Sequence, residues 1–114
     1  MTRVSAAQAT WIKAVQKEIS TKGAWGPDTR KMKEIQRKDL PPALKKVFDR
    51  MESGNPDGNA PDVYTKSVEG RLAFVFSDFF EGLTRFSIFD VTGKEIPMKH
   101  KPDKDGVVGL GPNE

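Results

Sequence analysis

The sequence predicts an α+β fold in which two to three N-terminal helices pack on one face of a four-stranded antiparallel β-meander. Apolar residues recur at helical spacing in the first half of the chain and alternate with period two in the second half. Short turns separate the alternating runs, and such connections make neighbouring strands antiparallel. We expect a single domain over residues 1–100, with helices over about 6–53 and the sheet over about 63–99, followed by an irregular tail over 101–114.

The composition narrows the class of protein further. The 114 residues suit one ordinary domain, with 36% hydrophobic and 31% charged residues. The chain has no cysteine, which excludes disulfides, thiolate nucleophiles and cysteine-based zinc sites. No apolar run approaches the roughly 18 residues that a membrane span requires. We therefore expect a cytoplasmic protein that makes no membrane contact.

Three helical segments are expected in the first half. Ser5 and Gln8 form a capping-box pattern at the start of a helix over about residues 6–20. A glycine-rich break ends it, and a short second helix follows. Pro41 and Pro42 suit the first turn of a third helix, where a missing amide hydrogen does no harm. The apolar residues expected on the inner sides of these helices are Trp11, Ile12, Val15, Ile19, Met32, Ile35, Leu40, Leu44, Val47, Phe48 and Met51.

The second half predicts four strands, because β-branched and aromatic residues gather in four runs between turn formers. These runs are residues 63–68, 71–77, 83–91 and 94–99. A two-residue turn at Glu69-Gly70 and a five-residue loop over 78–82 would place Phe74 opposite Phe86. The core face under the helices is then Val63, Thr65, Leu72, Phe74, Phe76, Phe86 and Ile88. The outer face is Tyr64, Lys66, Arg71, Ala73, Val75, Arg85, Ser87 and Phe89, extended by Ile96, Met98 and His100.

Charge is distributed unevenly along the chain. Residues 1–50 hold twelve Lys and Arg against five Asp and Glu, whereas residues 51–114 hold seven against eleven. Such an asymmetry indicates an acidic partner for the first half, either a protein or a nucleic acid. The alternative is a solvated helical surface that recognises nothing. The candidate basic patch consists of Arg30, Lys31, Lys33, Arg37, Lys38, Lys45, Lys46 and Arg50.

The outer face of the predicted sheet combines aromatic rings with cations, as a platform for single-stranded nucleic acid does. Two adjacent phenylalanines on the expected five-residue loop provide an aromatic anchor for a protein partner. The alternatives are that these side chains only shield the sheet, or that a second copy of the chain packs there as a homodimer. The candidate partner-binding residues are Tyr64, Lys66, Arg71, Arg85, Phe89, Phe79 and Phe80.

No motif of diagnostic specificity for catalysis, a metal or a cofactor is present, and we expect no cofactor. The loops over residues 55–59 and 103–106 lack the glutamate that a calcium loop of the EF-hand type requires. The enzyme alternative is a metal-independent, toxin-like ribonuclease that uses the open sheet face, with cations for the phosphate and one imidazole for proton transfer. Its catalytic residues would be Lys66, Arg71, Arg85 and His100.

The sequence therefore favours a small binding protein without catalytic activity, of the inhibitor, immunity or accessory type, that recognises an acidic macromolecule. The ribonuclease and a non-catalytic RNA- or DNA-binding protein are the alternatives. The sequence does not decide whether the basic helices or the sheet face is the binding surface.

Overall fold

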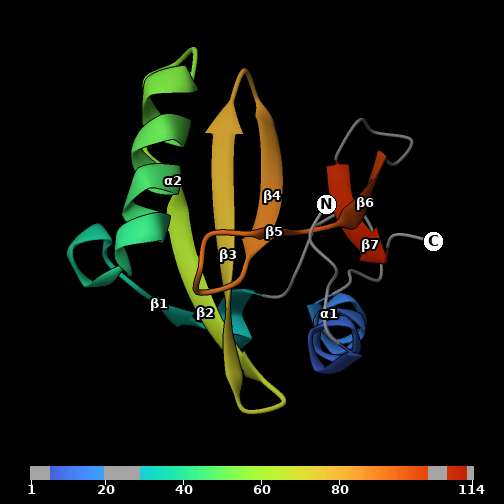
Figure 1. Ribbon diagram of the computed structural model, residues 1–114. Helices are drawn as coiled ribbons and strands as arrows, with labels where there is room; N and C mark the ends of the chain where they lie inside the picture. The colour runs from blue at the N-terminus through green and yellow to red at the C-terminus, as the bar shows by residue number, and fades with distance from the viewer. Residues whose placement is uncertain (1–5, 20–28, 103–107, 113–114) are drawn as a thin grey trace, which may run out of the picture.

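The computed structural model describes residues 6–19, 29–102 and 108–112, and these form an α+β fold (Figure 1). The helical elements are α1 (Ala6–Ile19), η1 (Thr29–Lys31), η2 (Arg37–Asp39) and α2 (Pro42–Gly54). The strands are β1 (Lys33–Glu34), β2 (Asp62–Val68), β3 (Arg71–Phe80), β4 (Leu83–Phe89), β5 (Glu95–Ile96), β6 (Met98–Pro102) and β7 (Val108–Pro112). Neither α-helix in this part of the chain is long and apolar enough to cross a membrane.

The first five strands form one antiparallel sheet in the order β1-β2-β3-β4-β5, which confirms the predicted α+β class and the antiparallel sheet. Within this sheet, β1 was not predicted. The short helix expected around Met32 and Ile35 is replaced by two 3-10 turns that flank β1. The chain extends there because Lys33 and Glu34 pair with β2, and the amide of Ile35 donates to the carbonyl of Val63 at 3.0 Å.

The two α-helices cover opposite faces of the sheet, so the prediction of all helices on one face is wrong (Figure 1). The cluster under α1 contains Trp11, Val15, Ile19, Val68, Ala73, Val75, Phe86, Ile88 and Ile96. The cluster under α2 contains Leu40, Leu44, Val47, Val63, Phe74, Phe76 and Phe89. Successive side chains of a strand point to opposite faces, and the chain has enough apolar residues to fill both.

The β3–β4 connection explains this error. The turn consists of Glu81 and Gly82 alone, at φ +52° and +76°, as in a two-residue hairpin of the primed type. Phe79 and Phe80, expected in a loop, continue β3. Phe74 therefore lies opposite Phe89 instead of Phe86. A register change of three residues moves every side chain of β4 to the other face, because the side-chain period of a strand is two.

The turn between β4 and β5 fixes the sheet to α2. The buried carboxylate of Asp90 accepts hydrogen bonds from the amides of Thr92 and Lys94 and from the Thr92 hydroxyl. Gly93 then adopts φ +86°, and a Cβ there would lie 3.0 Å from the Cβ of Ala43 at the start of α2. The turn thus requires glycine for its backbone angle and for its close approach to the helix.

Residues 108–112, expected to be irregular, form β7. It pairs antiparallel with β6 in a separate two-stranded sheet, where Met98 lies opposite Pro112 and Pro102 opposite Val108. The strand predicted over 94–99 is divided between β5, which closes the main sheet, and β6, which belongs to the second sheet. The last predicted strand therefore does not extend the main sheet as one unit.

Gly93→Ala is expected to lower the free energy of unfolding by about 2 to 3 kcal/mol, since it adds left-handed strain and a steric overlap with Ala43. Gly70→Ala is the matched control, because Gly70 also has a positive φ (+77°) but nothing within 4 Å of the added Cβ. That variant should lose about 1 kcal/mol. Urea denaturation measures both, and equal losses would contradict the packing of the turn on α2.

Candidate functional site

The predicted outer-face surface is divided between the two sides of the sheet. Tyr64, Lys66 and Arg71 lie on the side covered by α1, because their cross-strand partners Val75, Ala73 and Val68 belong to the α1 cluster. Arg85 and Phe89 lie on the side covered by α2, and Phe89 is only 2% exposed. The expectation that these five share one open face is wrong, because the β3–β4 turn has two residues instead of five.

Tyr64 is half-buried against the α1 cluster instead of standing free on an open sheet. Burial raises the pKa of its phenol, and the negative charges of Asp62 and Glu34 raise it further, against the opposing effect of a hydrogen bond with Thr29. A ring held in this way has little free area on which a base could stack.

The four residues of the ribonuclease alternative do not share a surface. Lys66 and Arg71 lie on the α1 side of the sheet, and Arg85 lies on the α2 side. His100 belongs to β6 in the other sheet, opposite Leu110, and its side chain lies outside the described residues. Among the residues that the structure describes, no group of three or more His, Cys, Asp or Glu could hold a metal ion.

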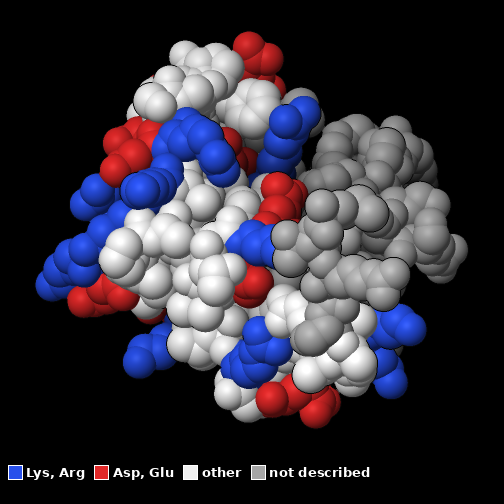
Figure 2. Space-filling model, viewed as in Figure 1, with Lys and Arg blue, Asp and Glu red and all other residues white. Residues whose placement is uncertain are grey.

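The basic patch predicted from sequence lies on the segment from η1 to α2. Leu44 and Val47 of α2 are buried and Phe48 and Met51 are half-buried, so the helix turns its charged residues outward. Figure 2 shows Lys and Arg side chains along the side of the molecule where Figure 1 draws α2 and β1, with a few acidic side chains among them. We call the following residues the basic surface: Lys31, Lys33, Arg37, Lys38, Lys45, Lys46 and Arg50. The side chain of Arg30 lies outside the described residues.

One cation of the basic surface is paired with a carboxylate. Arg37 donates from Nε and Nη2 to the two carboxylate oxygens of Asp49, each at 2.8 Å. This two-point hydrogen bond, reinforced by the charge of Arg37, lowers the pKa of Asp49, and it raises the pKa of Arg37. Among the described residues, Arg37 forms a salt bridge and the other cations of the basic surface do not. The pair fixes η2 against α2.

Phe79 and Phe80 lie near the end of the β3–β4 hairpin and point to opposite sides of the sheet. Phe79 is 50% exposed. Phe80 lies on the α2 side, where the Arg85 guanidinium stacks 5.2 Å from the centre of its ring. The two rings therefore do not form one continuous aromatic surface, and Phe79 is the more exposed of the two.

The loop after α2 holds the hairpin end in place. Asn55, which is 7% exposed, donates from Nδ2 to Asp78 Oδ1 at 2.8 Å and to the carbonyl of Phe79 at 2.9 Å, while its own oxygen accepts from the amide of Asp57. Asn59 donates to the same Phe79 carbonyl at 3.1 Å. The amide of Glu81 donates to Asp57 at 2.7 Å. The sequence suggested only a loop of turn formers here, because such contacts depend on the hairpin register.

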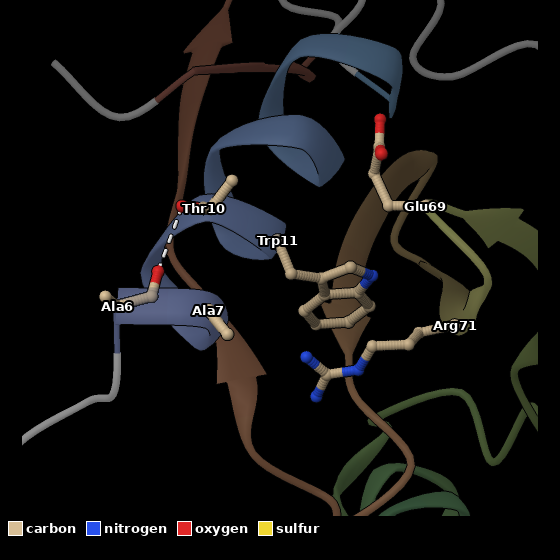
Figure 3. Close-up of a pocket in the computed structure, with 6 residues that line it drawn as sticks. All are labelled: Ala6, Ala7, Thr10, Trp11, Glu69 and Arg71. Atoms are coloured by element: carbon tan, nitrogen blue, oxygen red, sulfur yellow. Dashed lines mark hydrogen bonds between the residues drawn. The ribbon is translucent and has the colours of Figure 1, made fainter.

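A groove between α1 and the β2–β3 turn was not predicted. It has a volume of about 420 Å³ and is lined by Ala6, Ala7, Thr10, Trp11, Glu69 and Arg71 (Figure 3). The Arg71 guanidinium lies 4.6 Å from the centre of the Trp11 ring, and Nη2 donates to Gln8 Oε1 at 2.6 Å. Trp11 in turn donates to the carbonyl of Val68 at 2.9 Å. No spacing in the sequence links α1 to this hairpin, so sequence reasoning had no signal for the groove.

A second cavity of about 360 Å³ lies beside the basic surface, between β1, η2, α2 and the loop before β2. Its apolar walls include Ile35, Phe48 and Pro61, and its charged lining residues are Glu34, Arg37 and Asp62. Two carboxylates thus face one guanidinium, so the cavity does not favour an anion.

Comparison of the chain with protein-family models, with curated proteins and with solved structures gives no match in any of the three. Function must therefore be argued from the surfaces described above.

Arg37→Gln is expected to raise the pKa of Asp49 to its ordinary value, because the two-point hydrogen bond and the positive charge are both lost. NMR titration of the Asp49 carboxyl measures this change. In the parent protein the stabilising effect of the pair should be present above the unfolded-state pKa of Asp49 and disappear as the pH falls through the lower folded-state value. Lys38→Gln removes a neighbouring cation that makes no contact with Asp49, and a similar pKa rise in that variant would contradict the assignment.

Asn55→Ala is expected to lower the free energy of unfolding by about 1 to 3 kcal/mol, since the buried Asn55 loses three part-buried hydrogen bonds, to Asp78, to Phe79 and from Asp57. Asn59→Ala removes one exposed hydrogen bond and should cost less than about 1 kcal/mol. Chemical denaturation compares the two variants. If both lose the same stability, Asn55 does not hold the hairpin as described.

Proposed function

We propose that this chain is a non-enzymatic binding protein that recognises an acidic macromolecule through the basic surface of η1, β1, η2 and α2. One observation carries the proposal. Residues 29–54 hold eight of the 19 Lys and Arg but only four of the 16 Asp and Glu. The rest of the chain holds eleven Lys and Arg against twelve Asp and Glu. The whole positive excess of the protein is thus concentrated in one continuous segment.

The arrangement of these charges supports recognition better than it supports a role in stability. Lysine and arginine side chains that serve the fold usually pair with carboxylates or cover apolar surface. In the described chain, Arg37 has such a carboxylate partner. Lys46 and Arg50 lie one helical turn apart on the outer side of α2, where both are exposed and neither forms a salt bridge with a described carboxylate. Like charges at this spacing weaken an isolated helix, and an anionic partner would relieve that repulsion.

We expect the partner to bind this surface through its negative charges and not through bases stacked on aromatic rings. The aromatic rings of the cluster under α2 are inward: Phe48 is half-buried, and Phe74, Phe76 and Phe89 are buried. A platform for single-stranded nucleic acid needs exposed rings among its cations. This favours an acidic protein or a nucleic-acid backbone over recognition of unpaired bases.

Binding of three labelled polyanions tests the proposal: a glutamate-rich peptide, a single-stranded oligonucleotide and a duplex of equal length. At least one should bind, with an affinity that falls steeply with salt; for about four phosphate contacts the fall between 50 and 200 mM is roughly 100-fold. Binding of the peptide alone would identify an acidic protein as the partner class. Failure of all three polyanions at low salt would contradict the proposal.

A charge-reversal pair locates the binding surface. Lys46→Glu/Arg50→Glu should weaken binding at least tenfold, because two exposed cations of α2 become anions. Lys13→Glu/Lys94→Glu makes the same change in net charge at exposed positions of α1 and of the β4–β5 turn, and should weaken binding less than threefold. Fluorescence anisotropy measures all three proteins. Equal losses in the two variants would show that only net charge matters, which would overturn the assignment to this surface.

A further inference from the structure

We propose that the groove between α1 and the β2–β3 turn binds a carboxylate group carried on a small apolar body, with Arg71 as the partner of the anion. The groove lies on the α1 side of the sheet, opposite the basic surface. The inference therefore stands apart from the proposed function and can fail or succeed independently of it.

Arg71 provides the positive charge of the groove. Its guanidinium is exposed and permanently positive, and among the described residues it forms no salt bridge. Its protein hydrogen bond goes to a neutral amide oxygen, that of Gln8, at 2.6 Å. Glu69 lines the same groove, but Figure 3 shows its carboxylate and the guanidinium on opposite sides of the Trp11 ring. The charge is thus left available to an external anion.

The guanidinium of Arg71 is already held in one place. Trp11, which is 3% exposed, provides a flat surface 4.6 Å away, and Gln8 fixes one nitrogen. Gln8 also donates to the buried carboxylate of Asp90 at 3.4 Å, which ties the arrangement to the β4–β5 turn. An arginine stacked in this way keeps further N–H donors for a carboxylate and has less conformational entropy to lose on binding.

The walls of the groove are mainly apolar. Ala6 and Ala7 contribute methyl groups, and the hydroxyl of Thr10 donates to the carbonyl of Ala6 at 2.9 Å within α1. The groove therefore offers one cation beside a mainly apolar wall, which suits a monocarboxylate with a short aliphatic side chain, such as the C-terminus of a peptide. The carboxylate of Glu69 disfavours ligands with more negative charge, including the phosphate dianion.

NMR of the isotope-labelled full chain tests this inference with a matched pair of probes, N-acetyl-L-leucine and N-acetyl-L-leucinamide, which differ only in the carboxylate. The acid should give saturable shifts of the Trp11 indole N–H and the Arg71 Nε–H signals, in the millimolar range. The amide should bind at least tenfold more weakly, and inorganic phosphate at least threefold more weakly than the acid. Equal binding of the amide or of phosphate, or no saturable shift with the acid, would overturn the proposal.

Two variants locate the ligand. Arg71→Gln removes the charge and should abolish binding of the acid. Ala7→Glu places a carboxylate in the groove at an exposed position in the first turn of α1, where glutamate is compatible with the helix, and it should also abolish binding. Because this second variant leaves Arg71 and Trp11 unchanged, it keeps the test valid if Arg71→Gln fails to fold. Undiminished binding by a folded Ala7→Glu protein would exclude the groove as the site.

Discussion

Residues 73–76 of β3 are buried on both faces of the sheet, and this double burial determines where the two helices lie. Ala73 and Val75 belong to the cluster under α1, whereas Phe74 and Phe76 belong to the cluster under α2. A strand with apolar side chains on both faces is stable only when each face is covered. The helices are therefore separated by the sheet, and the protein has three layers instead of two.

Because a helix covers each face of the sheet, neither face is open for binding. Candidate binding surfaces therefore lie on the outer sides of the helices and at the edges of the layers. The cations of α2 face outward because the inner side of that helix fills one core. Arg71 lies at the edge of the other core, where it covers Trp11 and faces a groove. The two surfaces differ in chemistry, since the first is broad and repeatedly charged and the second combines one cation with an apolar wall. We propose the first as a site for an acidic macromolecule and the second as a site for a small carboxylate.

The fold class, both α-helices, the antiparallel order and the first hairpin could be predicted because each depends on local periodicity and turn chemistry. The second hairpin could not, because the segment Ser77 to Gly82 fits a five-residue loop and a two-residue turn equally well by composition. The continuous apolar run from Leu72 to Phe76 was the available signal of burial on both faces. The side-chain hydrogen bonds of Trp11 and Arg71 at the groove join residues 57 or more apart in sequence, and Asn55 contacts Asp78 and Phe79, which are 23 and 24 residues away. No local sequence pattern encodes such contacts.

Cross-strand NOEs between β3 and β4 test most directly the register that divides the side chains of the sheet between its two faces. This register predicts contacts between Val75 and Ile88 and between Ser77 and Phe86, which pair across the two strands. Contacts between Phe74 and Phe86 and between Leu72 and Ile88 would contradict it, because they would restore the five-residue loop and return the cationic and aromatic side chains to one shared face.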